Sequence, residues 1–247
     1  MQKKAAERKS QGLFVIEGRR EVSLALDNDV KPRSIFICKE IYNPDSAYPI
    51  DLNSFADTPV FEVSSEVYEK IAYRGDTQGI IMVAHNILKE LKDIKKSNND
   101  FYLVLESIEK PGNLGAVMRT ADASGISGII ICGHNFDIYN PNVIRSSLGC
   151  IFTLPIIVAA NEEALHYFKT NNYQVLAAHP EGTEFYTNIN YNKNSAVILG
   201  TESEGLSDFW IENANLLIKI PMHGQIDSLN ISVSAAIITY EAIRQKN

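Results

Sequence analysis

Three short segments in the C-terminal half carry residues whose types and spacing could do chemistry. In the first, residues 109–125, a Pro-Gly pair precedes Asn113 and Arg119. Asn113 can cap a helix, and a loop that leads into a helix can cradle an anion or a ribose. Because a separation of six residues does not fit the helical period, Asn113 and Arg119 share a helix face only if Asn113 lies before the helix. Alone, this segment favours an ordinary capped helix with an exposed arginine.

The second segment, residues 197–206, is a strand that ends in a glycine-flanked turn. This turn carries two carboxylates, Glu202 and Glu204. Paired acids near a strand end could do acid and base work, although a solvated turn is the commoner case.

The third segment, residues 220–234, combines a strand end, a turn and the start of a final helix. Pro221 stops strand pairing, Gly224 allows a turn, and Ser228 is expected to cap the helix. His223 invites a catalytic interpretation, but a surface histidine in a loop is favoured.

Several familiar site motifs do not occur in the sequence. It contains no G-x-G-x-x-G, no G-x-x-x-x-G-K-[ST] phosphate loop, no G-x-S-x-G elbow and no H-E-x-x-H. The missing phosphate loops weigh against a generic α/β nucleotide enzyme.

The three segments fall among apolar runs that predict a parallel sheet. Continuous apolar runs separated by helical stretches are typical of strands buried on both faces. Ligands of such sheets bind beyond the carboxyl ends of the strands, so the loops after Leu105, Leu199 and Ile220 are expected to carry the site. The runs are residues 101–105, 128–132, 154–158, 173–178, 196–199 and 216–220.

The N-terminal part is predicted to be a smaller α/β unit. Strand-like runs at 34–38, 59–63 and 78–84 surround a helix at 64–72. Residues 87–100 lose apolar density, as expected of a solvated helix that runs into a linker. The predicted organisation is therefore a domain at 1–86, a linker at 87–100 and a second domain at 101–247.

Composition limits the class of protein. Hydrophobic residues make up 45% of the chain and charged residues 21%, which suits a globular protein. The net charge of −7 argues against a general nucleic-acid coat, although a local basic patch is still possible. Three scattered cysteines suggest neither a disulfide framework nor a zinc site. With no secretory signal and no apolar run long enough to span a membrane, a cytoplasmic protein is expected.

Taken in order, the three segments resemble the motifs of the SpoU, or TrmH-like, RNA ribose methyltransferases of the SPOUT superfamily. The pattern N-x-G-x-x-x-R matches Asn113, Gly115 and Arg119. The family's other two motifs match a larger set of positions, namely Gly200, Glu202, Gly205 and Leu206, then Ile220, Pro221, Met222, Gly224, Ser228, Leu229, Asn230, Ile231 and Ser232.

The resemblance implies a fold and a cofactor. It implies a parallel α/β sheet whose C-terminal part threads a trefoil knot, a homodimer, and a small α/β RNA-recognition domain in front. It also implies S-adenosylmethionine as cofactor and no metal. The residues expected to hold the cofactor are Leu199, Gly200, Thr201, Ile220, Met222, Ser228 and Leu229.

The resemblance further implies methylation of a ribose 2′-hydroxyl. The expected catalytic residues are Arg119, Asn113, Glu202, Ser228 and Asn230. A guanidinium has a pKa above roughly 12 and stays charged, so we expect Arg119 to grip the phosphate and ribose rather than act as a base. The two asparagines would orient the ribose, and Glu202 would hold the arginine or its loop.

Two further expectations concern the residues that contact RNA and the class of RNA that is methylated. Candidate RNA-binding residues are Arg19, Arg20, Arg74 and Arg145, and Thr77 stands where many relatives have a histidine. Because an unpaired nucleotide exposes its base and 2′-hydroxyl, a structured ribosomal RNA is expected. A transfer RNA methyltransferase and a catalytically silent RNA-binding knot protein are the alternatives.

Overall fold

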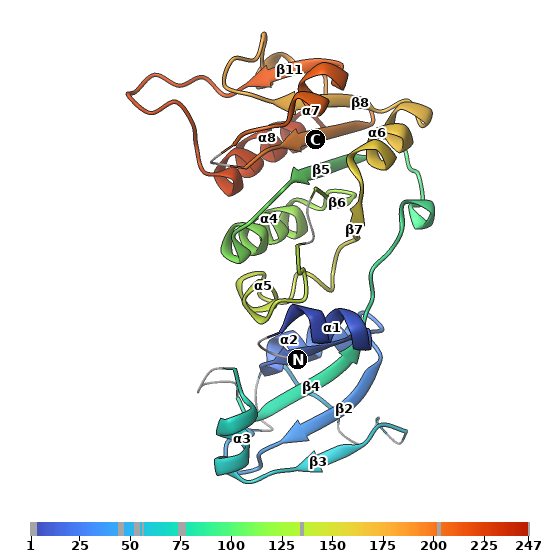
Figure 1. Cartoon of the computed structure of the whole chain (residues 1–247), viewed down its shortest axis with the longest axis vertical. Coiled ribbons are helices and arrows are strands. Elements are labelled where there is room, and N and C mark those ends of the chain that lie inside the picture. The colour runs from blue at the N-terminus through green and yellow to red at the C-terminus, as the bar shows by residue number, and fades with distance from the viewer. Residues whose placement is uncertain are drawn as a thin grey trace. The chain divides into compact units, whose positions relative to one another are not determined.

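The computed structural model describes residues 4–43, 47–51, 55, 57–73, 78–133, 136–201 and 204–246. Three residues singled out from the sequence, Arg74, Thr77 and Glu202, lie outside these ranges. The chain divides into two compact units, the first formed by residues 1–87 with 137–153 and the second by residues 88–136 with 154–247. Figure 1 shows the elements of both units.

The first unit is built on a four-stranded sheet in the order β1-β4-β2-β3. Strand β4 runs antiparallel to β1 and β2, and β2 runs parallel to β3. The strands are β1 (Leu13–Glu17), β2 (Pro32–Ile37), β3 (Val60–Glu62) and β4 (Ile80–His85). The helices are α1 (Ala5–Gln11), α2 (Arg19–Asp27), α3 (Ser65–Ile71) and α5 (Pro141–Ser146). The predicted small α/β unit is confirmed, although β1 was not predicted from the sequence.

Residues 137–153 belong to the core of this first unit. The ring of Phe14 in β1 stacks on Tyr139 at 4.1 Å between centroids and on Phe152 at 6.1 Å. The buried Arg8 guanidinium donates from Nε to Asp137 at 3.0 Å. Aromatic stacking and a partly buried ion pair therefore join a distant stretch of chain to β1 and α1.

The second unit is a seven-stranded parallel sheet in the order β7-β6-β5-β10-β8-β11-β9. Its strands are β5 (Phe101–Glu106), β6 (Gly128–Cys132), β7 (Ile156–Ala159), β8 (Gln174–Ala178), β9 (Glu184–Phe185), β10 (Ser195–Leu199) and β11 (Leu216–Lys219). Its helices are α4 (Pro111–Ser124), α6 (Asn161–Thr170), α7 (Asp208–Asn213) and α8 (Ile231–Lys246), with single 3-10 turns at Leu91–Asp93 and Tyr186–Asn188. The predicted parallel sheet is confirmed, and only the two-residue β9 is an additional strand.

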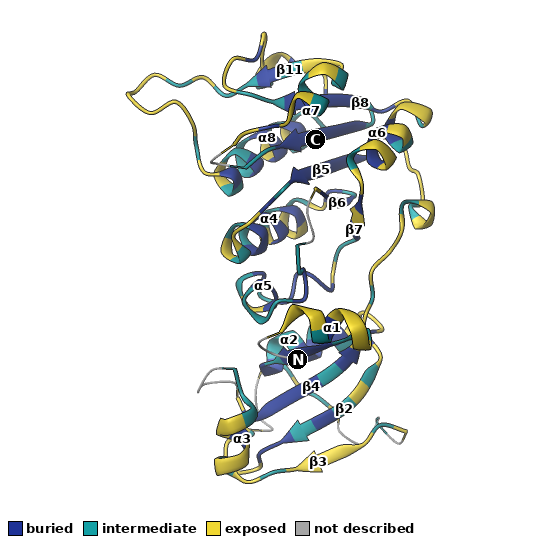
Figure 2. Cartoon of the chain, viewed as in Figure 1, coloured by how far each residue is buried: buried dark blue, intermediate teal, exposed yellow. Residues whose placement is uncertain are grey.

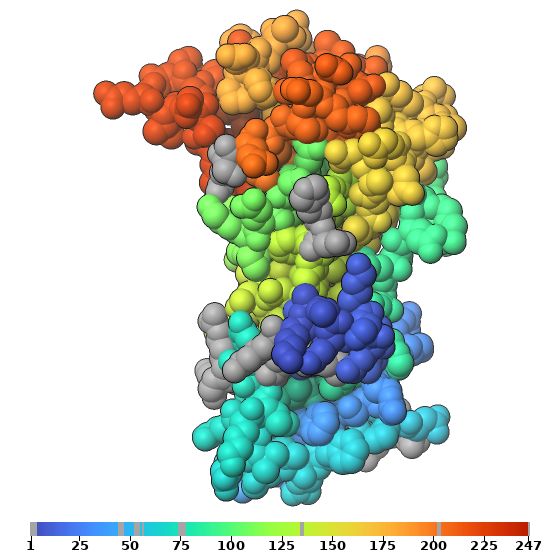
Figure 3. Space-filling view, viewed as in Figure 1, coloured from blue at the N-terminus to red at the C-terminus, as the bar shows by residue number. Residues whose placement is uncertain are grey.

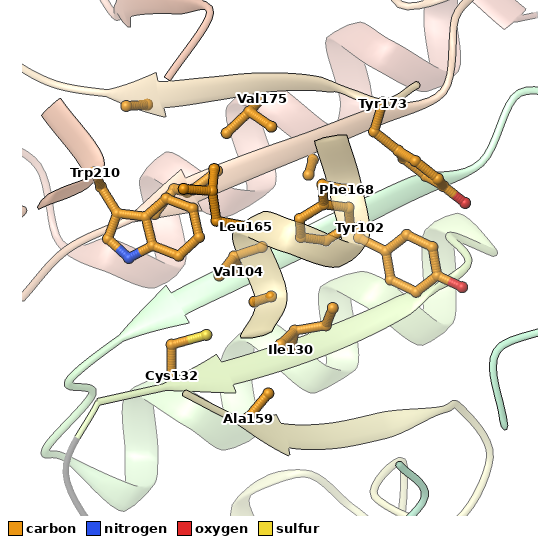
Figure 4. Packing of buried hydrophobic residues seen from close by; sticks show 14 of the residues in the cluster. Tyr102, Val104, Ile130, Cys132, Ala159, Leu165, Phe168, Tyr173, Val175 and Trp210 are labelled. Atoms are coloured by element: carbon orange, nitrogen blue, oxygen red, sulfur yellow. The ribbon is translucent and has the colours of Figure 1, made fainter. Parts of the chain in front are cut away.

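Both faces of this sheet are covered. On one face, α6 and α7 pack Leu165, Phe168 and Trp210 against alternate strand residues such as Val104 (Figure 4). Every residue of β5 and of β10 is buried, so the side chains that point to the opposite face are enclosed as well (Figure 2). Helices α4 and α8 pack against each other.

The stretch 87–100 differs from the expected solvated helix. It contains only the 3-10 turn at Leu91–Asp93, and Lys89 forms an isolated parallel bridge with Ile157. Leu91 and Ile94 pack against the apolar cluster of the second unit. These two apolar side chains thus tie the segment to the second unit instead of leaving it solvated.

In the part of the chain that the structure describes, no helix has both the length and the apolar character needed to cross a bilayer.

The fully buried Trp210 provides a test of the core. Trp210→Ala should lower the free energy of unfolding by about 3–5 kcal/mol, because it leaves a large void beneath α7. Trp210→Phe should cost clearly less, since the indole Nε1 donates to no acceptor within the described ranges. Urea unfolding of both variants measures the difference, and equal losses would contradict this description of the core.

Candidate active site

A cavity of about 820 Å³ lies in the second unit at the carboxyl ends of β8, β10 and β11. Its walls come from the loops that follow these strands and from the start of α8. The segment after β11 extends from the body of this unit before it returns to α8 (Figure 3). All seven residues that the sequence proposed for the cofactor line this one cavity, namely Leu199, Gly200, Thr201, Ile220, Met222, Ser228 and Leu229.

The turn after β10 is closed by its own backbone. Thr201 and Gly205 exchange two backbone hydrogen bonds, at 3.2 and 3.0 Å. Gly205 has a φ of +70°, a conformation that suits glycine. A Cβ on Gly200 would lie 2.2 Å from the carbonyl carbon and oxygen of Gly205. The two glycines therefore let the turn fold back on the strand end and bring main chain to the cavity wall.

A buried carboxylate anchors the far end of this turn. Glu106, the last residue of β5, is 4% exposed. Its oxygens accept hydrogen bonds from the Ser207 backbone N at 2.8 Å, the Ser207 Oγ at 2.7 Å and the Asn161 Nδ2 at 2.8 Å. Three donors compensate the burial of this carboxylate and fix the chain just after Leu206. Glu106 was not among the residues predicted from the sequence, although an acid at the end of an apolar strand is a recognisable signal.

The loop after β8 was also missed. His179 and Glu181 line the cavity, and the His179 Nδ1 accepts from the Glu181 backbone N at 3.2 Å. Phe185 lies under the Lys219 ammonium at 5.3 Å, and both line the same cavity. Applying the rule about strand ends to the run 173–178, as well as to its neighbours, would have found this loop.

The lining suits S-adenosylmethionine. Leucine, isoleucine and proline side chains beside exposed main chain can enclose an adenine and a ribose, and the tight glycine turn permits a close approach. Acidic residues, Glu181, Glu204 and Asp227, stand on the same cavity and suit a ligand that carries a sulfonium and an ammonium group. The donor set therefore fits this cofactor.

Asn113 and Asn230, which are 117 residues apart in the sequence, lie next to each other in the second unit. The Asn230 Nδ2 donates to the Asn113 Oδ1 at 3.2 Å. The Asn230 Oδ1 accepts from the Ser232 backbone N at 2.9 Å and from its Oγ at 2.6 Å. One side chain thus caps α8 and reaches α4.

Two expected helix caps are wrong. Asn113 is the third residue of α4, whose N-cap position is Lys110. Helix α8 begins at Ile231, so Ser228 stands too early to cap it and Asn230 does so instead. Pro111 explains the first difference, because proline favours the first turn of a helix and starts α4 before Asn113.

Arg119 is exposed on α4 and does not line the cavity. At 3.6 residues per turn it lies about 120° around the helix from Asn113. Within the described ranges its guanidinium forms no ion pair or hydrogen bond, and its expected partner Glu202 lies outside them. The side chain is therefore available to a ligand on this surface of α4.

The four arginines expected to contact RNA do not share one environment. Arg19 is 1% exposed, and its guanidinium donates to the carbonyls of Asn43 and Tyr48, so it holds this segment of chain and is not a surface contact for RNA. Arg20 and Arg145 line a second cavity, within the first unit. Arg74 lies outside the described residues.

Metal ligation finds no support in the described ranges, where no three His, Cys, Asp or Glu side chains gather into a potential site. The cysteines Cys38, Cys132 and Cys150 are free and buried.

Comparison with known proteins agrees with this geometry. Residues 100–240 match the model of the SpoU rRNA Methylase family, and residues 1–82 match that of the MRM3-like substrate binding domain. The chain is 28% identical to the 23S rRNA (guanosine(2553)-2′-O)-methyltransferase RlmP of Bacillus subtilis (strain 168), over 95% of this chain and 90% of that protein.

Solved structures show the same architecture. An RNA 2′-O ribose methyltransferase is 36% identical, with a TM-score of 0.82 over 98% of this chain and 92% of that one. The TrmH/SpoU tRNA modifying enzyme of A. aeolicus is 27% identical, with a TM-score of 0.54 over 63% of this chain and 80% of that one.

A parallel α/β unit with a cofactor cavity at its strand ends, and a substrate-binding domain before it, define an RNA methyltransferase that uses S-adenosylmethionine. More particularly, the chain belongs to the SpoU rRNA methylase family.

The tight turn after β10 leads to a test of the cofactor cavity. Gly200→Ala should weaken S-adenosylmethionine binding at least tenfold, because its Cβ would collide with the Gly205 main chain and displace the turn. Gly112→Ala is the matched control, since a Cβ there meets no atom within 4 Å. Titration calorimetry measures both, and unchanged affinity in Gly200→Ala would show that the cofactor does not use this turn.

Proposed function

We propose that the protein methylates the 2′-hydroxyl of an unpaired nucleotide in ribosomal RNA, with the cofactor bound in the cavity at the ends of β8, β10 and β11. The observation that carries this proposal is the convergence of three separate loops on one cavity lined by all seven expected cofactor residues. When bound, S-adenosylmethionine supplies an electrophilic methyl group on its sulfonium. The protein's task is then alignment of a ribose oxygen and removal of one proton.

Ribosomal RNA is favoured by the extent of the similarity. The Bacillus relative that is named for ribosomal RNA matches 95% of this chain, and residues 1–82 separately match a substrate-binding domain. The A. aeolicus enzyme that is named for tRNA matches only 63% of this chain. The relative that is named for ribosomal RNA therefore matches more of this chain than the enzyme named for tRNA, which supports a ribosomal target.

Main-chain groups and apolar side chains would bind the cofactor. Leu199, Ile220 and Leu229 would enclose the adenosine, with Gly200 and Thr201 presenting backbone groups from the closed turn. Ser228 and Met222 would complete the wall from the segment after β11. Because the turn that carries Gly200 and Thr201 is closed by its own backbone hydrogen bonds, this wall of the cavity is formed before the cofactor binds.

The ribose would be oriented by the asparagine pair. Asn113 and Asn230 are joined at 3.2 Å between α4 and α8, so their amides are fixed relative to each other. Ser228 precedes Asn230 on the same loop and also lines the cofactor cavity, which supports a role at the border of the two ligands. Fixed amide groups can align a hydroxyl without moving during the reaction.

Arg119 would grip the phosphate of the target nucleotide. Its guanidinium stays charged and presents a planar set of donors that matches phosphate oxygens. Exposure on α4 supports a partner that arrives with the RNA. Glu202 would hold this arginine or its loop. The proton of the ribose hydroxyl would be lost late in the methyl transfer or be passed on through the phosphate.

We also propose a domain at 1–86, a linker at 87–100 and a knotted methyltransferase domain at 101–247, of which residues 137–153 belong to the first compact unit. We propose that the protein acts as a cytoplasmic homodimer. Val233 and Tyr240, seven residues apart on α8, are 44% and 51% exposed, which supports a contact with a second copy. Light scattering should then give about twice the chain mass of 27.5 kDa.

Substitution of Arg119 tests its proposed contact with the phosphate of the target nucleotide. Arg119→Ala should lower kcat/KM for RNA by about 10²–10⁴-fold while leaving the affinity for S-adenosylmethionine unchanged, because the residue lies outside that cavity. Arg119→Lys should recover only part of the loss, since an ammonium cannot bind two phosphate oxygens side by side. Steady-state kinetics with radiolabelled cofactor measures both, and near-normal turnover with lysine would contradict a bidentate grip.

Mapping of 2′-O-methyl groups in cells identifies the target. Deletion of the gene should remove a methyl mark from ribosomal RNA, and the wild-type gene should restore it while Arg119→Ala should not. Loss of a mark in tRNA instead would show that the alternative substrate is the true one, and loss of no ribose mark would count against the proposed activity.

A further inference from the structure

A second cavity, of about 360 Å³, lies entirely within the first unit. Its size falls within the roughly 300–1,000 Å³ of small-molecule sites, and it shares no lining residue with the cofactor cavity. The side chains that could recognise a ligand there are Arg20, Glu21, Tyr48, Tyr73 and Arg145.

The two arginines reach this cavity from distant parts of the sequence. Arg20 belongs to the first turn of α2, and Arg145 belongs to α5. The Arg20 Nε is buried, and within the described ranges no acceptor lies at hydrogen-bond distance from it. Because a buried donor without a partner is unfavourable, a ligand that accepts from the Arg20 Nε would gain a stabilising hydrogen bond.

Most other polar groups of the wall are already engaged. The Gln78 Oε1 accepts from the Arg19 backbone N at 3.0 Å, and the Glu17 Oε1 accepts from the Tyr73 backbone N at 2.7 Å. The Tyr73 Oη accepts from Asn142 Nδ2 at 3.3 Å. These bonds fix parts of the wall, and among the described residues the Arg20 Nε has no hydrogen-bond partner.

The charges around the cavity exclude a simple anion as the best ligand. Burial raises the pKa of Glu21, and Arg20 and Arg145 oppose this shift, so both arginines act on the same carboxylate. Glu17 adds a second acid. A ligand that fits must therefore offer acceptors to the arginines and donors to a carboxylate.

The aromatic side chains add a flat surface. The Arg20 guanidinium stands 5.8 Å from the centroid of the Tyr48 ring, and Tyr73 lies on the same cavity. A nucleotide combines a planar face, ring acceptors and amino donors, and a phosphate. Tyrosine and arginine are the side chains on which unpaired bases commonly stack.

We propose that this cavity receives one unpaired nucleotide of the RNA substrate and so serves as a recognition site separate from the methyl-transfer cavity. The inference rests on the proposed methylation of RNA. Tyr48 binds the base by stacking, the Arg20 Nε donates to an acceptor of the nucleotide, and Arg145 binds its phosphate or carbonyl oxygens. Glu21 accepts from an amino group of the base.

Matched arginine substitutions test the proposal in the full-length protein. Arg145→Ala and Arg20→Ala should each raise the Kd for a ribosomal RNA fragment about tenfold in fluorescence anisotropy, with S-adenosylmethionine affinity unchanged. Arg33→Ala is the control, because it removes an exposed arginine from β2 that does not line the cavity. Arg33→Ala should change the Kd less than twofold. Arg145 is exposed, so its variant remains informative even if Arg20→Ala lowers stability.

Abasic substitutions in the RNA identify the bound nucleotide. One abasic position should weaken binding to the wild type about tenfold and have little further effect on Arg145→Ala. Equal Kd values for Arg145→Ala and Arg33→Ala, or additive losses at every position, would overturn the recognition site. Absence of methyl transfer by the wild type would instead count against the proposed function, so the two failures are distinguishable.

Discussion

The hydrogen bonds of the buried Glu106 carboxylate hold together the edge of the sheet on which the cofactor cavity depends. This one side chain joins the end of β5 to Ser207, at the end of the turn after β10, and to Asn161 at the start of α6. A buried charge is tolerated only when donors surround it, so the surrounding chain cannot move without leaving it unpaired. The turn that carries Gly200 and Gly205 is fixed at one end by the strand and at the other by this carboxylate.

The parallel sheet places this anchored turn beside the other loops that line the cofactor cavity. Because all strands of the second unit point the same way, the loops after β8, β10 and β11 meet at a single edge. The Asn113–Asn230 bond adds the pair of helices α4 and α8 to the same arrangement. Cofactor loops, ribose-orienting amides and a charged surface arginine therefore come from separate segments. In the first unit, Arg20 and Arg145 likewise come from separate segments of the chain and line a different cavity.

Much of this organisation could be predicted from the sequence, and the exceptions have physical reasons. Apolar runs predicted the parallel sheet because strands buried on both faces leave no polar positions. The cofactor residues could be predicted because the resemblance to the SpoU motifs assigns that role to particular positions of this sequence. The burial of Arg19 was not predictable, since the carbonyls of Asn43 and Tyr48 that receive it come from a segment without a motif. The role of Glu106 depends on partners 55 and 101 residues away, which no local pattern connects.

The central claim is methyl transfer to a ribose oxygen of RNA, and a comparison of two RNA substrates tests it most directly. The full-length protein is incubated with S-adenosylmethionine and ribosomal RNA, and the modified nucleotide is located by mass spectrometry. A second RNA carries a 2′-deoxy residue at that position alone. We expect a 2′-O-methyl nucleotide in the first RNA and no methylation at that position in the second. A methyl group on the base, or equal methylation of both RNAs, would contradict this claim.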